Sequence, residues 1–218
     1  MTIKTVLFDF DGTLFDTVEG ITRSVRYALN KIGLDAPLEQ LRCFAGPPLL
    51  DMFMEKFGLT EEQAEQAVRD YRERYKPIGI YESRPFPGMA ELLRDLRRAG
   101  LRLGVATSKP QNMAEQLLEQ EHMTDLLDGI FGADPMGSGN AKWQVIQRAM
   151  EALGAEADST VLVGDTKYDV FGAQRCGIPC IGVRFGYAAE GELEAAGAAA
   201  IAEDPAALKA LLCGEAEA

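Results

Sequence analysis

Two aspartates, separated by one residue, follow an apolar β-branched stretch near the start of the chain. Asp9 and Asp11 stand in "TVLFDFDGTLFD", whereas carboxylates are rare inside strands because they lose hydration there without a partner. Two acids at this spacing can divide the chemical work between them. One can act as a nucleophile and contact a metal, while the other donates and then accepts a proton.

Further polar groups stand beside other apolar segments. Thr107 and Ser108 follow "LGVA", Asp165 follows "TVLVG", and Lys142 begins a helical segment between them. Parallel sheets bind ligands at the carboxyl ends of their strands. If these apolar segments form such a sheet, the polar groups and the two aspartates meet at one edge.

Four acids would lie at that edge, namely Asp9, Asp11, Asp165 and Asp169. Their carboxylates would repel one another unless cations offset their charge. Oxygen-only ligation by few protein groups favours Mg²⁺, which keeps waters and takes substrate phosphate oxygens. A helix that begins near Gln111 would offer backbone N–H groups to an anion. No P-loop or dinucleotide glycine motif is present, and "GSGN" (137–140) lacks the third glycine.

Each group also has a purely structural explanation. "DFDG" could form a turn, although Gly12 and Gly20 depart from the spacing of an EF-hand calcium loop. Thr107 could only cap a helix, Lys142 could be one more surface lysine, and Asp169 could cap the helix after "GDT". The convergence of the groups, rather than any one of them, favours a site for Mg²⁺ and phosphate.

Six apolar segments predict the strands that would carry these groups. Helical periodicity lies between them, as in Leu92, Leu93 and Leu96. Strands that are apolar on both faces and alternate with helices predict a parallel sheet covered on both sides. The predicted strands are 5–10, 101–107, 129–134, 160–165, 179–186 and 198–204.

The stretch 16–82 is different, because it contains helical patterns and no convincing strand. We therefore expect an α/β core of residues 1–15 and 83–218, with a Rossmann-like parallel sheet flanked by helices. An all-helical cap domain, residues 16–82, would be inserted after the first strand.

Composition limits the partners. The chain has 218 residues, 47% hydrophobic and 26% charged, with a net charge of −12, which disfavours a nucleic-acid polymer as ligand. The longest apolar runs are too short to span a membrane and no signal peptide is evident, so we expect a cytoplasmic protein without a membrane partner. We expect a monomer or a weak homodimer.

Cysteine and histidine usage excludes further classes. The four cysteines are scattered and the chain has a single histidine, His122. A zinc site is therefore disfavoured, and reduced thiols are expected. Most Ser-His-Asp and Cys-His schemes would depend on that one histidine, in "EQEHMTD".

As a set, four segments resemble the motifs of the haloacid dehalogenase superfamily. They are "DFDGTL", "VATSKP", the lysine of "AKWQVI" and "GDTKYD", in the family's order, and the resemblance covers nearly the whole chain. The helical insert resembles the cap of the phosphoglycolate phosphatase-like branch. The segments at 41–49, 85–110 and 186–198 are similar to members of that branch described as 5′-nucleotidases or general phosphatases.

The resemblance implies a catalytic role for each matching residue. Asp9 would be the nucleophile that forms an aspartyl-phosphate, and Asp11 the general acid and base. Thr107 and the backbone of Ser108 would hold the phosphoryl group. Lys142 would neutralise charge between Asp9 and the phosphate.

The resemblance also implies a Mg²⁺ site. Asp9, Asp165 and the main-chain carbonyl of Asp11 would bind the ion. The residues that would support this site are Gly12, Thr13 and Asp169.

Two departures bear on the substrate. Trp143 follows Lys142 where phosphoglycolate phosphatases usually have proline, and Thr166 stands where mutase relatives have an acid. The main hypothesis is a Mg²⁺-dependent phosphomonoesterase of small soluble metabolites, such as nucleoside monophosphates or phosphoglycolate. The alternatives are a phosphosugar mutase and a silent regulator that binds phosphorylated ligands, the latter disfavoured by the presence of Asp9 and Asp11.

Five residues of the helical insert are candidates for contact with the leaving group. Aromatic side chains there could stack on a base, or they could simply pack the helices together. The candidates are Arg42, Phe44, Tyr71, Tyr75 and Tyr81.

Overall fold

The computed structural model describes residues 2–134 and 140–214, so most of the "GSGN" segment lies outside the described residues. The chain divides into two compact units. Met1–Phe15 and Pro85–Ala218 form the core unit, and Asp16–Arg84 forms the helical unit. The chain passes between them in two short strands that pair with each other, β2 (Phe15–Asp16) and β3 (Arg84–Pro85), which the sequence did not predict. This pairing accounts for a second boundary after residue 84 rather than after 82.

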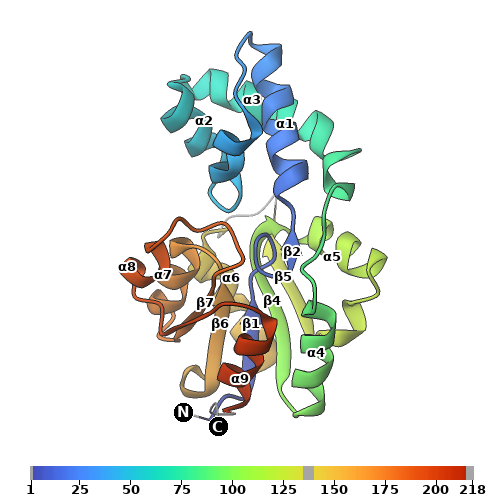
Figure 1. Cartoon of the computed structure of the whole chain (residues 1–218), viewed down its shortest axis with the longest axis vertical. Coiled ribbons are helices and arrows are strands. Elements are labelled where there is room, and N and C mark those ends of the chain that lie inside the picture. The colour runs from blue at the N-terminus through green and yellow to red at the C-terminus, as the bar shows by residue number, and fades with distance from the viewer. Residues whose placement is uncertain (1, 135–139, 215–218) are drawn as a thin grey trace. The chain divides into compact units, whose positions relative to one another are not determined.

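The core unit contains a six-stranded parallel sheet in the order β5-β4-β1-β6-β7-β8 (Figure 1). All six predicted strands are confirmed as elements of this sheet. Buried apolar residues fill the inner strands, as expected for a parallel sheet covered on both faces. The strands are β1 (Thr5–Phe8), β4 (Arg102–Pro110), β5 (Gly129–Ala133), β6 (Thr160–Gly164), β7 (Cys180–Val183) and β8 (Ala200–Ala202).

Helices cover both faces of this sheet. One face packs against α6, α7 and α8 through a cluster that includes Leu7, Val145 and Val170. Helices α4 and α9 pack together over the other face, and α5 lies along β4 and β5 (Figure 1). The helices are α4 (Met89–Arg98), α5 (Gln111–Gln120), α6 (Lys142–Leu153), α7 (Lys167–Arg175), α8 (Glu192–Ala196) and α9 (Pro205–Cys213), with 3₁₀ turns at Thr124–Leu126 and Ala157–Ser159.

The strand order brings the predicted polar groups to neighbouring strand ends. β1 lies between β4 and β6, with Phe8 in register with both Val105 and Val163. The chain fills one side of β1 with β4 and β5 and then returns to the other side with β6, so the ends of these strands flank a topological switch point.

Strand β4 is longer than predicted. It continues through Thr107 to Pro110, and its pairing with β5 shifts register between Ala106 and Pro110. Thr107 and Lys109 are buried, whereas Ser108 between them is exposed. Alternation along a strand explains this pattern, and it places Thr107 and Lys109 on the same side of β4.

The helical unit is built on three α-helices, in agreement with the helical patterns that the sequence shows in this stretch. They are α1 (Val18–Lys31), α2 (Leu49–Phe57) and α3 (Glu61–Tyr75), with 3₁₀ turns at Leu38–Phe44 and Gly79–Tyr81. Helix α1 packs along α3 and the first 3₁₀ turn. A methyl group on Gly20 would collide with the carbonyl oxygen of Gly79, which explains why α1 has a glycine there.

Charged side chains connect the elements of the helical unit. The two terminal guanidinium nitrogens of Arg74 each donate to a carboxylate oxygen of Glu82 at 2.9 Å, and Arg23 donates to the same carboxylate at 2.9 Å. Lys31 bonds the buried Asp70 at 2.6 Å. Among the described helices of the chain, none is long and apolar enough to cross a membrane.

Candidate active site

Asp9 is the first residue after β1. Its N–H donates to the carbonyl of Val163 at 2.8 Å, which extends the pairing of β1 with β6 by one residue. Lys142, the first residue of α6, has its Nζ 2.5 Å from Asp9 Oδ1 and 2.7 Å from Asp169 Oδ1. All three side chains are at least nine-tenths buried. A lysine at the start of a helix therefore joins two acids that are distant in sequence.

Asp165 and Asp169 come from the end of β6 and the start of α7. Asp165 is fully buried and accepts from the N–H of Tyr187 at 2.8 Å and from Thr13 Oγ1 at 3.4 Å. Asp169 Oδ2 accepts from the N–H and the hydroxyl of Thr166, at 3.0 and 2.9 Å. Asp169 thus caps the start of α7, as its structural interpretation predicted, and it also bonds Lys142.

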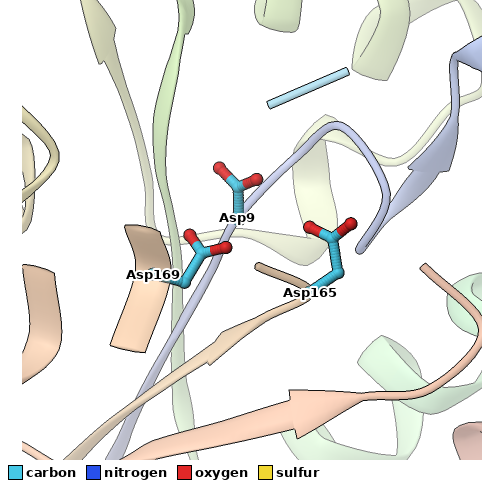
Figure 2. Close-up of side chains that lie close together, drawn as sticks. All are labelled: Asp9, Asp165 and Asp169. Atoms are coloured by element: carbon cyan, nitrogen blue, oxygen red, sulfur yellow. The ribbon is translucent and has the colours of Figure 1, made fainter. Parts of the chain in front are cut away.

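The carboxylates of Asp9, Asp165 and Asp169 form one cluster, which we call the acid cluster (Figure 2). One oxygen from each lies within 4.8 Å of the others. Oxygen donors at this spacing suit a hard divalent cation such as Mg²⁺. The side chain of Asp11 is outside the acid cluster, so a contact of Asp11 with the ion would fall to its main chain.

The electrostatics of the acid cluster indicate a deficit of positive charge. Burial raises the pKa of Asp9 from 3.8 to about 6 even though Lys142 opposes the shift, and Asp169 adds to it. Burial, followed by the charges of Asp169 and Asp9, raises the pKa of Asp165 well above its usual range. Burial alone would lower the pKa of Lys142, but Asp169 and Asp9 outweigh it and raise that pKa. A bound cation would favour the charged forms of these acids and so lower their pKa values.

Two glycines allow the backbone to approach Asp165. Gly12 has φ +84°, and a Cβ there would collide with Asp165 Oδ2. A Cβ on Gly186 would likewise collide with the side chain of Asp165, at 2.6 Å from Oδ2. The sequence pointed to Gly12 through the first motif, but it gave Gly186 no role, because a single glycine after a strand resembles any turn residue.

The second predicted acid has a lysine of its own. Lys109 Nζ lies 2.9 Å from Asp11 Oδ1, with side chains that are 3% and 14% exposed. The N–H of Lys109 donates to Thr107 Oγ1 at 3.1 Å, so this residue contacts two predicted site residues. Lys109 is part of the segment "VATSKP", but it was not predicted to be a site residue. Its one signal is a lysine two residues after Thr107 on the same face of a buried strand.

Burial inside the helical unit changes the set of substrate-contact candidates there. Phe44, Tyr71 and Tyr75 are almost fully buried. Phe44 packs on Phe53 with ring centroids 5.0 Å apart, and Tyr71 stacks on Tyr75 at 5.0 Å. We withdraw these three as candidates because packing already occupies their surfaces. Arg42 and Tyr81 are exposed and stay predictions.

Comparison with known proteins places this site in a family. Residues 6–183 match the model of the haloacid dehalogenase-like hydrolases. The chain is 41% identical to a 5′-nucleotidase of Pseudomonas aeruginosa over 208 residues, 95% of this chain and 94% of that protein. It is 39% identical to the tyrosine-protein kinase PtkA of Mycobacterium tuberculosis, covering 84% of this chain and 62% of the relative. A crystal structure of a predicted phosphatase from Clostridium acetobutylicum superposes with a TM-score of 0.94 at 39% identity, covering 98% of this chain and all of that one.

The chain belongs to the haloacid dehalogenase-like hydrolase family. Within it, the chain is an enzyme of the phosphatase type, as its relatives and structural neighbours indicate. The parallel sheet and the acid cluster at its carboxyl edge agree with the resemblance drawn from the four sequence motifs.

Proposed function

We propose that this protein is a Mg²⁺-dependent phosphomonoester hydrolase of small metabolites that works through an aspartyl-phosphate on Asp9. The observation that carries the proposal is the acid cluster, in which three buried carboxylates lie together at the carboxyl edge of the parallel sheet and two of them, Asp9 and Asp169, bond Lys142. A divalent cation and a phosphate group are the partners that such a set of charges favours.

The metal would be held by Asp9, Asp165 and the main-chain carbonyl of Asp11. Asp169 would lie next to the metal without being one of its main ligands, because Lys142 and Thr166 already bond the Asp169 carboxylate. The oxygen-only donors and the raised pKa values of Asp9 and Asp165 fit this ion. When bound, Mg²⁺ supplies neutralisation of the phosphate charge.

The residues of the chain carry the remaining steps. Asp9 attacks the phosphorus atom, the ester P–O bond breaks, and the leaving oxygen takes a proton from Asp11. Asp11 then takes a proton from a water molecule whose oxygen attacks the phosphorus of the aspartyl-phosphate, which releases inorganic phosphate and restores Asp9. Lys142, Thr107 and the N–H of Ser108 hold the phosphoryl oxygens through both steps.

The proposed substrates are small phosphate esters, with nucleoside monophosphates the first to test. The relative named 5′-nucleotidase supports this choice. Trp143, in the place of the proline typical of phosphoglycolate phosphatases, disfavours phosphoglycolate. The described cysteines are all unpaired, which supports the proposal of a reducing compartment such as the cytoplasm.

The direct test is release of inorganic phosphate with Mg²⁺, and with EDTA as control. The panel contains nucleoside monophosphates, phosphoglycolate, sugar phosphates and pyridoxal phosphate. Release that needs Mg²⁺ and disappears in Asp9→Asn would support the proposal, while Glu82→Gln serves as a control variant of the helical unit. No release from any ester, or full release by Asp9→Asn, would refute it. A sugar phosphate that is isomerised without release would indicate the mutase alternative.

A further inference from the structure

We propose that Lys109 is a positioning residue that holds Asp11 for proton transfer, an inference that rests on the proposed function. Lys109 lies on β4 with its side chain 3% exposed, and its Nζ is 2.9 Å from Asp11 Oδ1. Burial of an unpaired ammonium group is costly, and the carboxylate of Asp11 is the partner that offsets this cost for Lys109.

The backbone around Asp11 leaves its carboxylate in need of such a partner. Asp11 lies in the turn after β1, where it forms an isolated bridge with Phe15 and precedes Gly12 at φ +84°. Its side chain is 14% exposed, more than any carboxylate of the acid cluster. A carboxylate at the start of a turn can rotate about its side-chain bonds, and a fixed charge on one oxygen restricts that rotation.

Lys109 is itself held in place. Its Nζ lies 5.4 Å from the centroid of the Phe10 ring, which stacks on Phe15 with centroids 4.5 Å apart. Its N–H donates to Thr107 Oγ1, a bond that leaves the hydrogen of this hydroxyl to donate elsewhere. One residue thus orients both the hydroxyl predicted to hold the phosphoryl group and the carboxylate predicted to move the proton.

The geometry assigns different duties to the two oxygens of Asp11. Lys109 contacts Oδ1, so Oδ2 is the oxygen that carries the proton to the leaving group and later takes one from water. Lys142 has no part in this, because it bonds Asp9 and Asp169. The two lysines therefore serve the two acids separately, one for attack and one for proton transfer.

The test compares two esters of similar size in wild type and in Lys109→Met. p-Nitrophenyl phosphate has a leaving group that departs without a proton, whereas the leaving group of phenyl phosphate needs one. The value of kcat/KM reports the steps up to loss of the leaving group. We expect Lys109→Met to lower kcat/KM for phenyl phosphate on the order of 10-fold more than for p-nitrophenyl phosphate, since a general acid contributes roughly 10²–10⁴-fold. Inhibition by inorganic phosphate should change little.

Three controls separate positioning from a structural effect. Lys209→Met removes another ion-paired lysine of the core unit, which bonds Asp95, and should leave both esters unaffected. In an Asp11→Asn background, Lys109→Met should add no further preference between the esters. Lys109→Gln keeps a donor of shorter reach and should fall between Lys109→Met and wild type, so the inference can be tested even if the methionine variant does not fold.

Equal losses on the two esters would overturn the inference, as would a preference that persists in Asp11→Asn. These failures differ from failure of the proposed function, in which wild type would release no phosphate from any ester.

Discussion

Two groups of poorly exposed acids, one in each unit of the molecule, bond to cations and yet differ in their electrostatics. In the helical unit, Glu82 accepts from Arg74 and Arg23, and these hydrogen bonds, that of Arg74 foremost, lower its pKa. In the core unit, Asp9 bonds Lys142, and burial nevertheless raises its pKa to about 6. The same kind of contact thus accompanies opposite shifts.

Burial is the largest cause of the shift at Asp9, whereas hydrogen bonding outweighs burial at Glu82, and the ratio of cations to acids adds to this difference. In the helical unit two guanidinium groups pair with two carboxylates, because Arg23 bonds Glu19 as well as Glu82, whereas Lys142 alone bonds two of the three carboxylates in the acid cluster. A structural ion pair is stable when its charges are balanced. A site that is short of positive charge in the protein alone has room for a cation from outside, and perturbed pKa values of this kind are typical of functional sites.

The largest effect that separates the two groups concerns activity. Asp9→Asn should lower kcat by about 10⁴-fold or more, because it removes the nucleophile. Phosphate release under saturating Mg²⁺ measures the loss, and circular dichroism confirms that the variant is folded. Activity within 10-fold of wild type would contradict the role of Asp9 and remove the functional side of the comparison.

A second effect concerns stability and pH in the metal-free protein. Because the pKa of Asp9 is raised from 3.8 to about 6, its contribution to stability is full below pH 3.8 and is lost as pH rises through 6. Asp9→Asn should therefore become more stable than wild type as pH rises from 4 to 7, by about 1–3 kcal/mol. Urea unfolding at several pH values with EDTA measures this difference. A variant that is less stable than wild type at pH 7 would show that Asp9 is adequately paired.

The smallest effect belongs to the helical unit. Glu82→Gln should lower the free energy of unfolding by about 1 kcal/mol at pH 7, since it weakens the bonds to Arg74 and Arg23. The pKa of Glu82 is lowered from 4.5, so its contribution is present above pH 4.5 and is lost as pH falls through the lowered value. Urea unfolding at pH 7 and pH 4 measures the change. A loss that is as large at pH 4 as at pH 7 would show that charge is not its cause.

The sheet and the acid cluster could be predicted because their signals are local. A buried parallel strand is an uninterrupted apolar run, and an acid at its end is visible in the sequence, as with Asp9 and Asp165. The two-residue strands β2 and β3 could not be predicted, since their pairing depends on where the chain crosses between the units. The end of β4 was placed too early because Thr107 and Ser108 resemble a helix cap.

Residues whose role depends on tertiary neighbours were harder to identify. Lys109 is buried by a strand alternation that its own segment does not reveal, and only the turn after β1 brings Asp11 to it. Tyr71 and Tyr75 have the residue type expected of a base-stacking platform, but helix packing buries them. Composition shows that aromatic surface is available, while the neighbours decide whether it faces a ligand or a core.

The most direct test of the central claim, that the acid cluster is completed by a divalent cation, is the midpoint of thermal unfolding as MgCl₂ is added at constant ionic strength. We predict a saturable rise in wild type, because a ligand that binds only the folded state stabilises it. The rise should persist in Glu82→Gln and disappear in Asp165→Asn. No rise in wild type, or an equal rise in Asp165→Asn, would contradict the claim.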